Sequence, residues 1–167
     1  MFKVKGKPVC EGIALGKTTV FRKNCQQVNL CRVQDSEEEL NRLSTATAKT
    51  KEQIRNLYDK AAAEVGEAGA SVFEVHQMML EDDGYLKAIS DMICKEKVSA
   101  EFAAAVTRDN YVEMFADMDD EYMKARAADV KDISNRLIRN LTGQEEIDFS
   151  SMEPSVLIMD SLTPSEM

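Results

Sequence analysis

The pattern of apolar and polar positions predicts a mainly helical chain. From Leu40 to Ala61, apolar or small residues recur at alternating three- and four-residue steps, which places them on one face of a long helix. The members of this stripe are Leu40, Leu43, Thr47, Thr50, Ile54, Leu57 and Ala61. Ser36 and Glu39 have the spacing of a capping box, so we expect the helix to begin at Ser36. Gly66 and Gly69 predict its end.

The next part of the chain repeats the helical pattern with short interruptions. A second helix is expected from Ala70 to Glu81, and a third helical piece from Tyr85 to about Lys95, with Gly84 between them. Ser99 is the expected N-cap of the helix that follows. The acidic cluster from Asp117 to Glu121 marks a break or a new helix start.

A last apolar stripe completes the helical region. It comprises Met123, Ala127, Val130, Ile133, Leu137 and Leu141, and Gly143 is well placed as a C-terminal cap. The middle of the chain is therefore predicted to form an antiparallel bundle of about four main helices.

The two ends of the chain carry strand signals instead. Short β-prone runs occur from Lys3 to Lys5 and from Ile13 to Phe21, and Ser155 to Asp160 is a near-continuous apolar run typical of a buried strand. Thr163, Pro164 and Glu166 together have the pattern of a helix start. Because the chain stops one residue later, we expect it to be a fragment cut inside a strand–helix unit.

Composition narrows the possible functions. The chain has 167 residues with 30 acidic and 21 basic side chains, and its net charge of −9 argues against binding to nucleic acid or to an acidic membrane surface. A basic protein partner fits this charge, although solubility alone explains it equally well. No segment has the apolar length of a membrane helix or signal peptide. We expect a cytoplasmic protein whose four cysteines, Cys10, Cys25, Cys31 and Cys94, are free thiols.

The single histidine limits the chemistry that the chain can carry. His76 cannot complete a zinc set or a di-iron motif, and it has no second histidine with which to build a catalytic constellation, so we assign no catalytic residue and no metal site. It shares a helix face with Phe73 and Leu80, which predicts a half-buried packing histidine, with a partner contact as the alternative. Arg126 and Asp129 have the spacing of an ordinary helical ion pair.

Another face of the second helical region is a candidate docking surface. Ser71, Val75, Met78, Asp82 and Tyr85 fall on this face. Met78 and Val75 would form a small apolar patch, and acidic residues surround it at Glu74, Glu81, Asp82 and Asp83. Such a patch suits a partner with a basic rim, but the same residues could equally be core.

Several segments, taken together, resemble the N-terminal domain of Enzyme I of the bacterial sugar phosphotransferase system, the phosphoenolpyruvate-protein phosphotransferase. The similar stretches are EGIALGK from Glu11, HQMMLEDD from His76, DDEYMKARAADVKDISNRLIRNLTG from Asp119 and LTPSE from Leu162. The resemblance covers nearly the whole chain in order. One departure is Glu11, where many relatives have proline.

The resemblance implies a fold and an activity. A helical subdomain of four helices, which binds the small phosphocarrier protein HPr, is inserted into an α/β phosphohistidine subdomain. Here the α/β part would comprise residues 1–34 and 144–167 and be incomplete, and the helical part would comprise residues 35–143. The intact protein would take a phosphoryl group from phosphoenolpyruvate onto a histidine, with Mg²⁺ and further Enzyme I domains, and pass it to HPr. That histidine belongs to a Gly-Gly-x-Thr-Ser-His motif beyond LTPSE, so this chain alone is expected to be inactive and to need no cofactor.

By motif position, the resemblance implies six contacts with HPr: Glu67, Ser71, Met78, Met79, Asp83 and Arg126. The alternative hypothesis is a free-standing helical interaction module without an enzymatic parent.

Overall fold

The computed structural model describes residues 12–21, 28–144, 153–159 and 162–166. They fall into two compact units, of which one comprises Gln26–Ile147 and Leu162–Met167, and the other Met1–Cys25 and Asp148–Ser161. The first unit is helical, and the second holds a small sheet. The expected subdomain boundaries after residues 34 and 143 stay a prediction.

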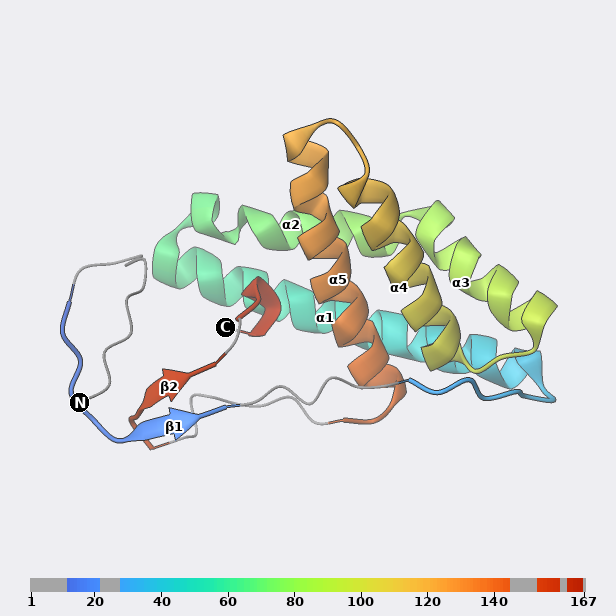
Figure 1. Cartoon of the computed structure of the whole chain (residues 1–167), viewed down its shortest axis with the longest axis horizontal. Helices are drawn as coiled ribbons and strands as arrows, with labels where there is room; N and C mark the ends of the chain where they lie inside the picture. The colour runs from blue at the N-terminus through green and yellow to red at the C-terminus, as the bar shows by residue number, and fades with distance from the viewer. Residues whose placement is uncertain (1–11, 22–27, 145–152, 160–161, 167) are drawn as a thin grey trace. The chain divides into compact units, whose positions relative to one another are not determined.

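The helical unit contains five helices in its described part (Figure 1). They are α1 Ser36–Val65, α2 Glu67–Glu81, α3 Asp83–Glu96, α4 Ala100–Ala116 and α5 Glu121–Leu141. The most extensive contacts join α4 to α5 and α1 to α2. The predicted helical bundle is confirmed. The number of helices exceeds four because α2 and α3 follow each other with only Asp82 between them.

The start of α1 differs from the predicted capping box. Asp35 is the N-cap, and its side chain accepts hydrogen bonds from the backbone N–H groups of Glu37 and Glu38. Ser36 is instead the first helical residue, and its hydroxyl donates to the carbonyl oxygen of Ile93 at 3.4 Å. The side chain of Glu39 turns away from its own helix start and accepts a hydrogen bond from the backbone N–H of Ala100 at 2.7 Å. Ser99 occupies the N-cap position of α4 but makes no side-chain capping bond. The carboxylate of Glu39 therefore supplies the cap of α4.

The predicted starts of α2 and α3 are a few residues late. Gly66, at φ +86°, is a one-residue break, and α2 begins directly after it at Glu67. Gly69 lies inside α2, where an added Cβ would meet Cγ2 of Val65 at 2.6 Å, so this glycine permits a close approach and does not end a helix. The second break falls at Asp82, whose carboxylate accepts from the backbone N–H of Tyr85 at 2.8 Å.

The predicted apolar stripes form the core. Ile54 of α1, Phe73 and Leu80 of α2, and Ile133 of α5 make one buried cluster. A larger cluster involves α1, α3, α4 and α5. Its buried members are Leu43, Ala46, Tyr85, Ile89, Ile93, Val98, Ala100, Ala103, Ala104, Ala105, Leu137, Ile138 and Leu141. Gly143 has φ +67° just beyond the end of α5, which confirms its predicted capping position.

The sheet unit consists, in its described part, of two parallel strands. β1, Thr18–Val20, pairs with β2, Val156–Ile158, with Thr19 opposite Leu157. The prediction of a buried strand is wrong here, because Leu157 is 37% and Ile158 52% exposed. A strand is buried on both faces only where other layers pack on the sheet, and the described part of this unit consists of two paired strands. The predicted strand from Lys3 to Lys5 lies outside the described residues.

The predicted helix start at Thr163 is confirmed, and it belongs to the helical unit. Pro164–Glu166 form the short 3₁₀ helix η2, and Glu166 accepts hydrogen bonds from the backbone N–H and the hydroxyl of Thr163. The buried carboxylate of Asp132 in α5 accepts from the backbone N–H of Ser165 at 3.0 Å and from its hydroxyl at 2.5 Å. Arg136 donates to the carbonyl oxygen of Ser165. These contacts hold the segment against α5.

Candidate docking surface

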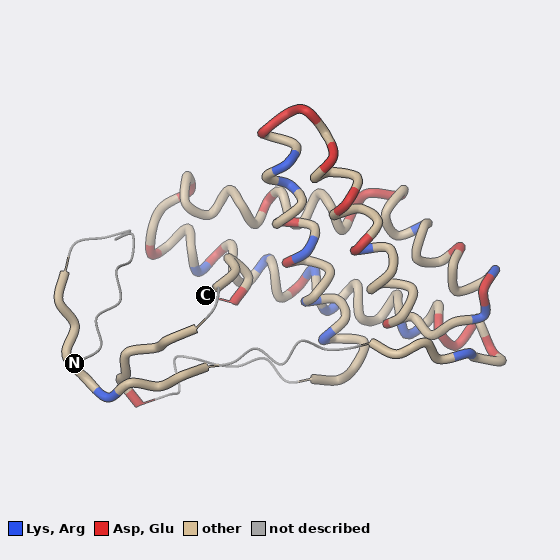
Figure 2. The backbone as a smooth tube through the Cα atoms, in the orientation of Figure 1, with Lys and Arg blue, Asp and Glu red and all other residues tan. Residues whose placement is uncertain are grey.

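The outer face of α2 is acidic with an apolar residue within it. Glu67, Ser71 and Met78 are exposed on this helix, and Met78 is 70% exposed. Figure 2 shows no Lys or Arg along α2, whose charged residues are three glutamates. Asp83 is also exposed and is the first residue of α3. An exposed methionine surrounded by carboxylates is an adaptable contact for a protein with a basic rim.

The apolar part of this face is smaller than the sequence pattern suggested. Tyr85 is only 3% exposed, and its hydroxyl lies 2.6 Å from the hydroxyl of Ser134. The break at Asp82 separates Tyr85 from α2, so it does not continue the face that carries Met78. Val75 is half-buried, and Met79 is half-buried against the cluster around Ile54. Met78 is therefore the exposed apolar centre of the surface.

The inner face of α2 carries His76, which is fully buried. The expectation of a half-buried histidine is wrong, because its exposure is 0%. Phe73 contacts the ring edge-on, with the two centroids 6.0 Å apart. Nε2 of His76 lies 3.5 Å from Oδ1 of Asp129 in α5, which is longer than an ordinary hydrogen bond. The histidine is deeper than expected because α5 packs across the face of α2 that carries it.

Asp129 connects this buried histidine to Arg126. Oδ2 of Asp129 accepts a hydrogen bond from Nη1 of Arg126 at 3.0 Å, which confirms the expected helical ion pair. Burial acts to raise the pKa of Asp129, but the contacts with His76 and Arg126 outweigh it and hold that pKa below its usual range.

Tyr122 supports Arg126 from one turn earlier in α5. Nη2 of Arg126 donates to the Tyr122 hydroxyl, and the guanidinium carbon lies 4.5 Å from the centre of the tyrosine ring. The pKa of Arg126 is raised, first by this hydrogen bond and further by Asp129. Tyr122 is 63% exposed. Sequence reasoning did not single out Tyr122, although its four-residue spacing from Arg126 is a usable signal.

The six residues expected to contact a partner come from three helices. Glu67, Ser71, Met78 and Met79 lie on α2, Asp83 begins α3, and Arg126 lies on α5. The contact between His76 and Asp129 places the Arg126 turn of α5 next to α2. Arg126 is partly exposed, and Met79 is half-buried against the core cluster around Ile54. The other four residues are exposed.

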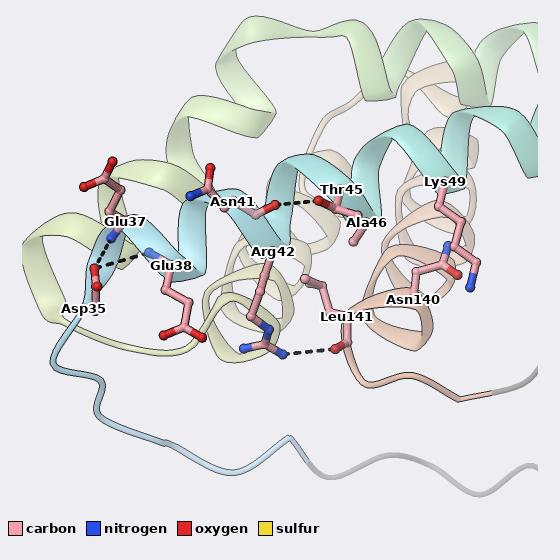
Figure 3. Close-up of a pocket in the computed structure, with 10 residues that line it drawn as sticks. All are labelled: Asp35, Glu37, Glu38, Asn41, Arg42, Thr45, Ala46, Lys49, Asn140 and Leu141. Carbon is pink, nitrogen blue, oxygen red and sulfur yellow. Dashed lines mark hydrogen bonds between the residues drawn. The ribbon is translucent and has the colours of Figure 1, made fainter.

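The helical unit also has an open hollow between the start of α1 and the end of α5 (Figure 3). Its lining includes Glu37, Glu38, Lys49 and Asn140, so the charges on it are of both signs. Arg42 projects into this region, but its guanidinium is bound by Glu39, by Glu101 and by the carbonyl oxygen of Leu141. Its role is thus to join helices, and the hollow offers no concentrated charge for a ligand.

Comparison with known proteins places the chain in a family. Residues 5–126 match the family described as PEP-utilising enzyme, N-terminal. The chain belongs to this family.

Relatives within the family extend the match over nearly the whole chain. Phosphoenolpyruvate-protein phosphotransferases from Bacillus subtilis and from Mycoplasma capricolum are 35% and 33% identical over 167 and 165 residues, which are 99% and 98% of this chain. The chain spans 29% of the length of each of these relatives. The resemblance to the N-terminal domain of Enzyme I is thereby confirmed.

Solved structures of Enzyme I proteins agree with the fold of this member of the family. A solution NMR structure of an Enzyme I (nEIt) protein is 32% identical and superposes with a TM-score of 0.78, over 90% of this chain and 62% of that one. The N-terminal domain of a nitrogen-type Enzyme 1 is 22% identical, with a TM-score of 0.71 over 89% of this chain and 63% of that one, and shows the fold alone.

Two further observations concern the described residues of this PEP-utilising enzyme domain. Cys31 and Cys94 are exposed free thiols, while Cys10 and Cys25 lie outside the described residues. Among the helices that the structure describes, none combines the length and the apolar character that a membrane crossing requires.

Proposed function

We propose that this chain is part of a cytoplasmic phosphoenolpyruvate-protein phosphotransferase, and that its helical unit docks the small phosphocarrier protein HPr. The observation that supports this most directly is the outer face of α2. It combines the exposed Met78 with glutamates and no basic residue, and Arg126 lies on the neighbouring turn of α5. The proposed contacts are Glu67, Ser71, Met78, Met79, Asp83 and Arg126.

The chemistry of this surface defines the partner that it suits. An exposed apolar side chain at the centre and charges at the rim are the usual arrangement of a protein interface. Acidic residues around Met78 favour a partner with lysine or arginine at its rim and speed the encounter through long-range attraction. Arg126 and Tyr122 are residue types that carry a large share of binding energy at interfaces. Carboxylates on the same surface favour one orientation of a partner with complementary charges.

Docking of this kind fits the activity proposed for the whole protein. Phosphoryl transfer from phosphoenolpyruvate by way of a histidine to HPr depends mainly on the positions of the reacting groups and on stabilisation of charge. A docking platform supplies the positioning. Mg²⁺ is expected of the reaction of the whole protein, and the docking step proposed here assigns the ion no role.

A titration of the ¹⁵N-labelled chain with unphosphorylated HPr tests the proposal. We expect saturable binding, with the largest NMR shift changes on α2, on Asp83 and around Arg126. The affinity should fall as salt is added, because exposed charges are screened beyond about 10 Å at 0.1 M salt.

Matched charge removals make the test specific. Glu67→Gln removes one carboxylate from the proposed surface, whereas Glu113→Gln removes one from an exposed position of α4. We expect weaker binding for the first and unchanged binding for the second. If the folded wild-type chain does not bind HPr, the proposal is contradicted, and a free-standing helical interaction module becomes the better hypothesis.

A further inference from the structure

We propose that His76 is a positioning residue for docking: through Asp129, it holds the guanidinium of Arg126 in the orientation that a partner meets. This inference rests on the proposed function, because it concerns the same surface. His76 itself is fully buried and cannot touch a partner. Its effect on docking must therefore pass through another side chain.

The carboxylate of Asp129 is the link between the two residues. One of its oxygens, Oδ1, faces Nε2 of His76 at 3.5 Å, and the other, Oδ2, accepts from Nη1 of Arg126 at 3.0 Å. The hydrogen bond with Arg126 and the longer contact with His76 together limit the rotation of this carboxylate about its last bond. An ordered Asp129 in turn orders the guanidinium of Arg126, whose other amino group, Nη2, donates a hydrogen bond to the Tyr122 hydroxyl.

The positions of these residues in the fold make the link relevant to α2. His76 is two residues before Met78 on the same helix, but it points inward, whereas Met78 is exposed. The inward residue thus ties the helix that carries the apolar contact to the helix that carries the cationic contact. An arginine that is ordered before the encounter loses less conformational freedom on binding, which favours affinity.

Packing alone does not explain a histidine at this position. Phe73, which contacts the ring edge-on, would accept an apolar ring equally well, and neither ring nitrogen of His76 has a hydrogen bond of ordinary length. A buried polar ring in that situation costs free energy that a phenyl ring does not. The contact that a phenyl ring lacks is the one between Nε2 and Asp129.

The first experiment measures Arg126 in the free 167-residue chain. His76→Phe keeps an aromatic ring but removes the nitrogen, and His76→Gln places an amide nitrogen near the position of Nε2. We expect a lower ¹H–¹⁵N heteronuclear NOE at Nε of Arg126 in His76→Phe than in the wild type, with recovery in His76→Gln. Asp129→Asn interrupts the same link from α5 and should lower this NOE as well. Leu80→Val, a change in the same apolar cluster that leaves the link intact, is the control and should not change it.

The second experiment measures the affinity for HPr. We expect His76→Phe to raise Kd roughly three- to tenfold, the size expected for residues coupled in one polar network. In an Arg126→Ala background, the same substitution should have no further effect. An equal loss in both backgrounds, or an unchanged NOE at Arg126, overturns the proposal and leaves His76 a packing residue. Failure of the wild-type chain to bind HPr contradicts the proposed function, while the NOE comparison still decides whether His76 orders Arg126.

Discussion

Glu39 gives the sharpest test of how the helical unit is held together. It lies in the first turn of α1, yet its carboxylate accepts a hydrogen bond from the backbone N–H of Ala100, the first residue of α4. Arg42 also donates to both of its oxygens at 2.7 Å. The substitution Glu39→Ala therefore removes the cap of α4 and leaves the N–H of a fully buried residue without its acceptor.

The expected loss of stability follows from these contacts. Loss of an N-terminal cap costs about 1 kcal/mol. A buried N–H group left without an acceptor costs about 1–3 kcal/mol. The two terms overlap, because they concern the same N–H group, so we expect Glu39→Ala to lower the free energy of unfolding by about 1–3 kcal/mol. Arg42 adds little to this loss, since Glu101 and the carbonyl oxygen of Leu141 still bind its guanidinium.

Urea unfolding followed by far-ultraviolet circular dichroism measures this difference. Glu38→Ala is the matched control, because it removes an exposed glutamate from the same turn of α1 and should change stability by less than about 0.5 kcal/mol. Glu39→Gln keeps an oxygen acceptor and should fall between the two. If Glu39→Ala is no less stable than Glu38→Ala, the argument that Glu39 caps α4 is refuted.

Three further outcomes follow from the structure. Burial raises the pKa of Tyr85 to about 12, so its contribution to stability is complete below about pH 10 and is lost as the pH rises through about 12. When the free energy of unfolding is measured across pH, that of Tyr85→Phe should fall less steeply than that of the wild type between about pH 10 and pH 12. The pKa of Asp129 is instead lowered, so its contribution is present above about pH 4 and disappears as the pH falls through the folded-state value. Asp129→Asn should flatten the acid limb, and an unchanged slope would contradict the contacts with His76 and Arg126. Gly66→Ala should cost about 1–3 kcal/mol in urea unfolding, since φ +86° with ψ 168° is a conformation that glycine alone adopts readily. Gly143→Asn, at the left-handed φ of +67°, should cost much less.

Much of the helical fold could be predicted because its signals are local. The stripe through Leu43 and Ile54, the break at Gly66 and the left-handed cap at Gly143 each depend on residues within a few positions of one another. Side-chain spacing along a helix is set by its geometry, whatever surrounds it. The acidic character of α2 was predictable as well, because its glutamates are read directly from the sequence, whereas the periodicity left Met78 open between the surface and the core.

Contacts between distant segments could not be predicted in this way. The sequence spacing of Ser36 and Glu39 fits a capping box, but Glu39 caps another helix, because the start of α4 presents a buried N–H group within its reach. His76 is fully buried because α5 crosses the inner face of α2 and brings Asp129 against it.

The sequence by itself therefore determined the helices, the ends of α1 and α5 at Gly66 and Gly143, and the acidic character of α2, since these depend on near neighbours in the chain. The tertiary structure alone decided which carboxylate caps which helix, that Tyr85 leaves the surface while Met78 stays on it, and that Arg126 lies beside α2. Those outcomes depend on packing between residues far apart in sequence, and many arrangements of the same helices share one pattern of apolar positions.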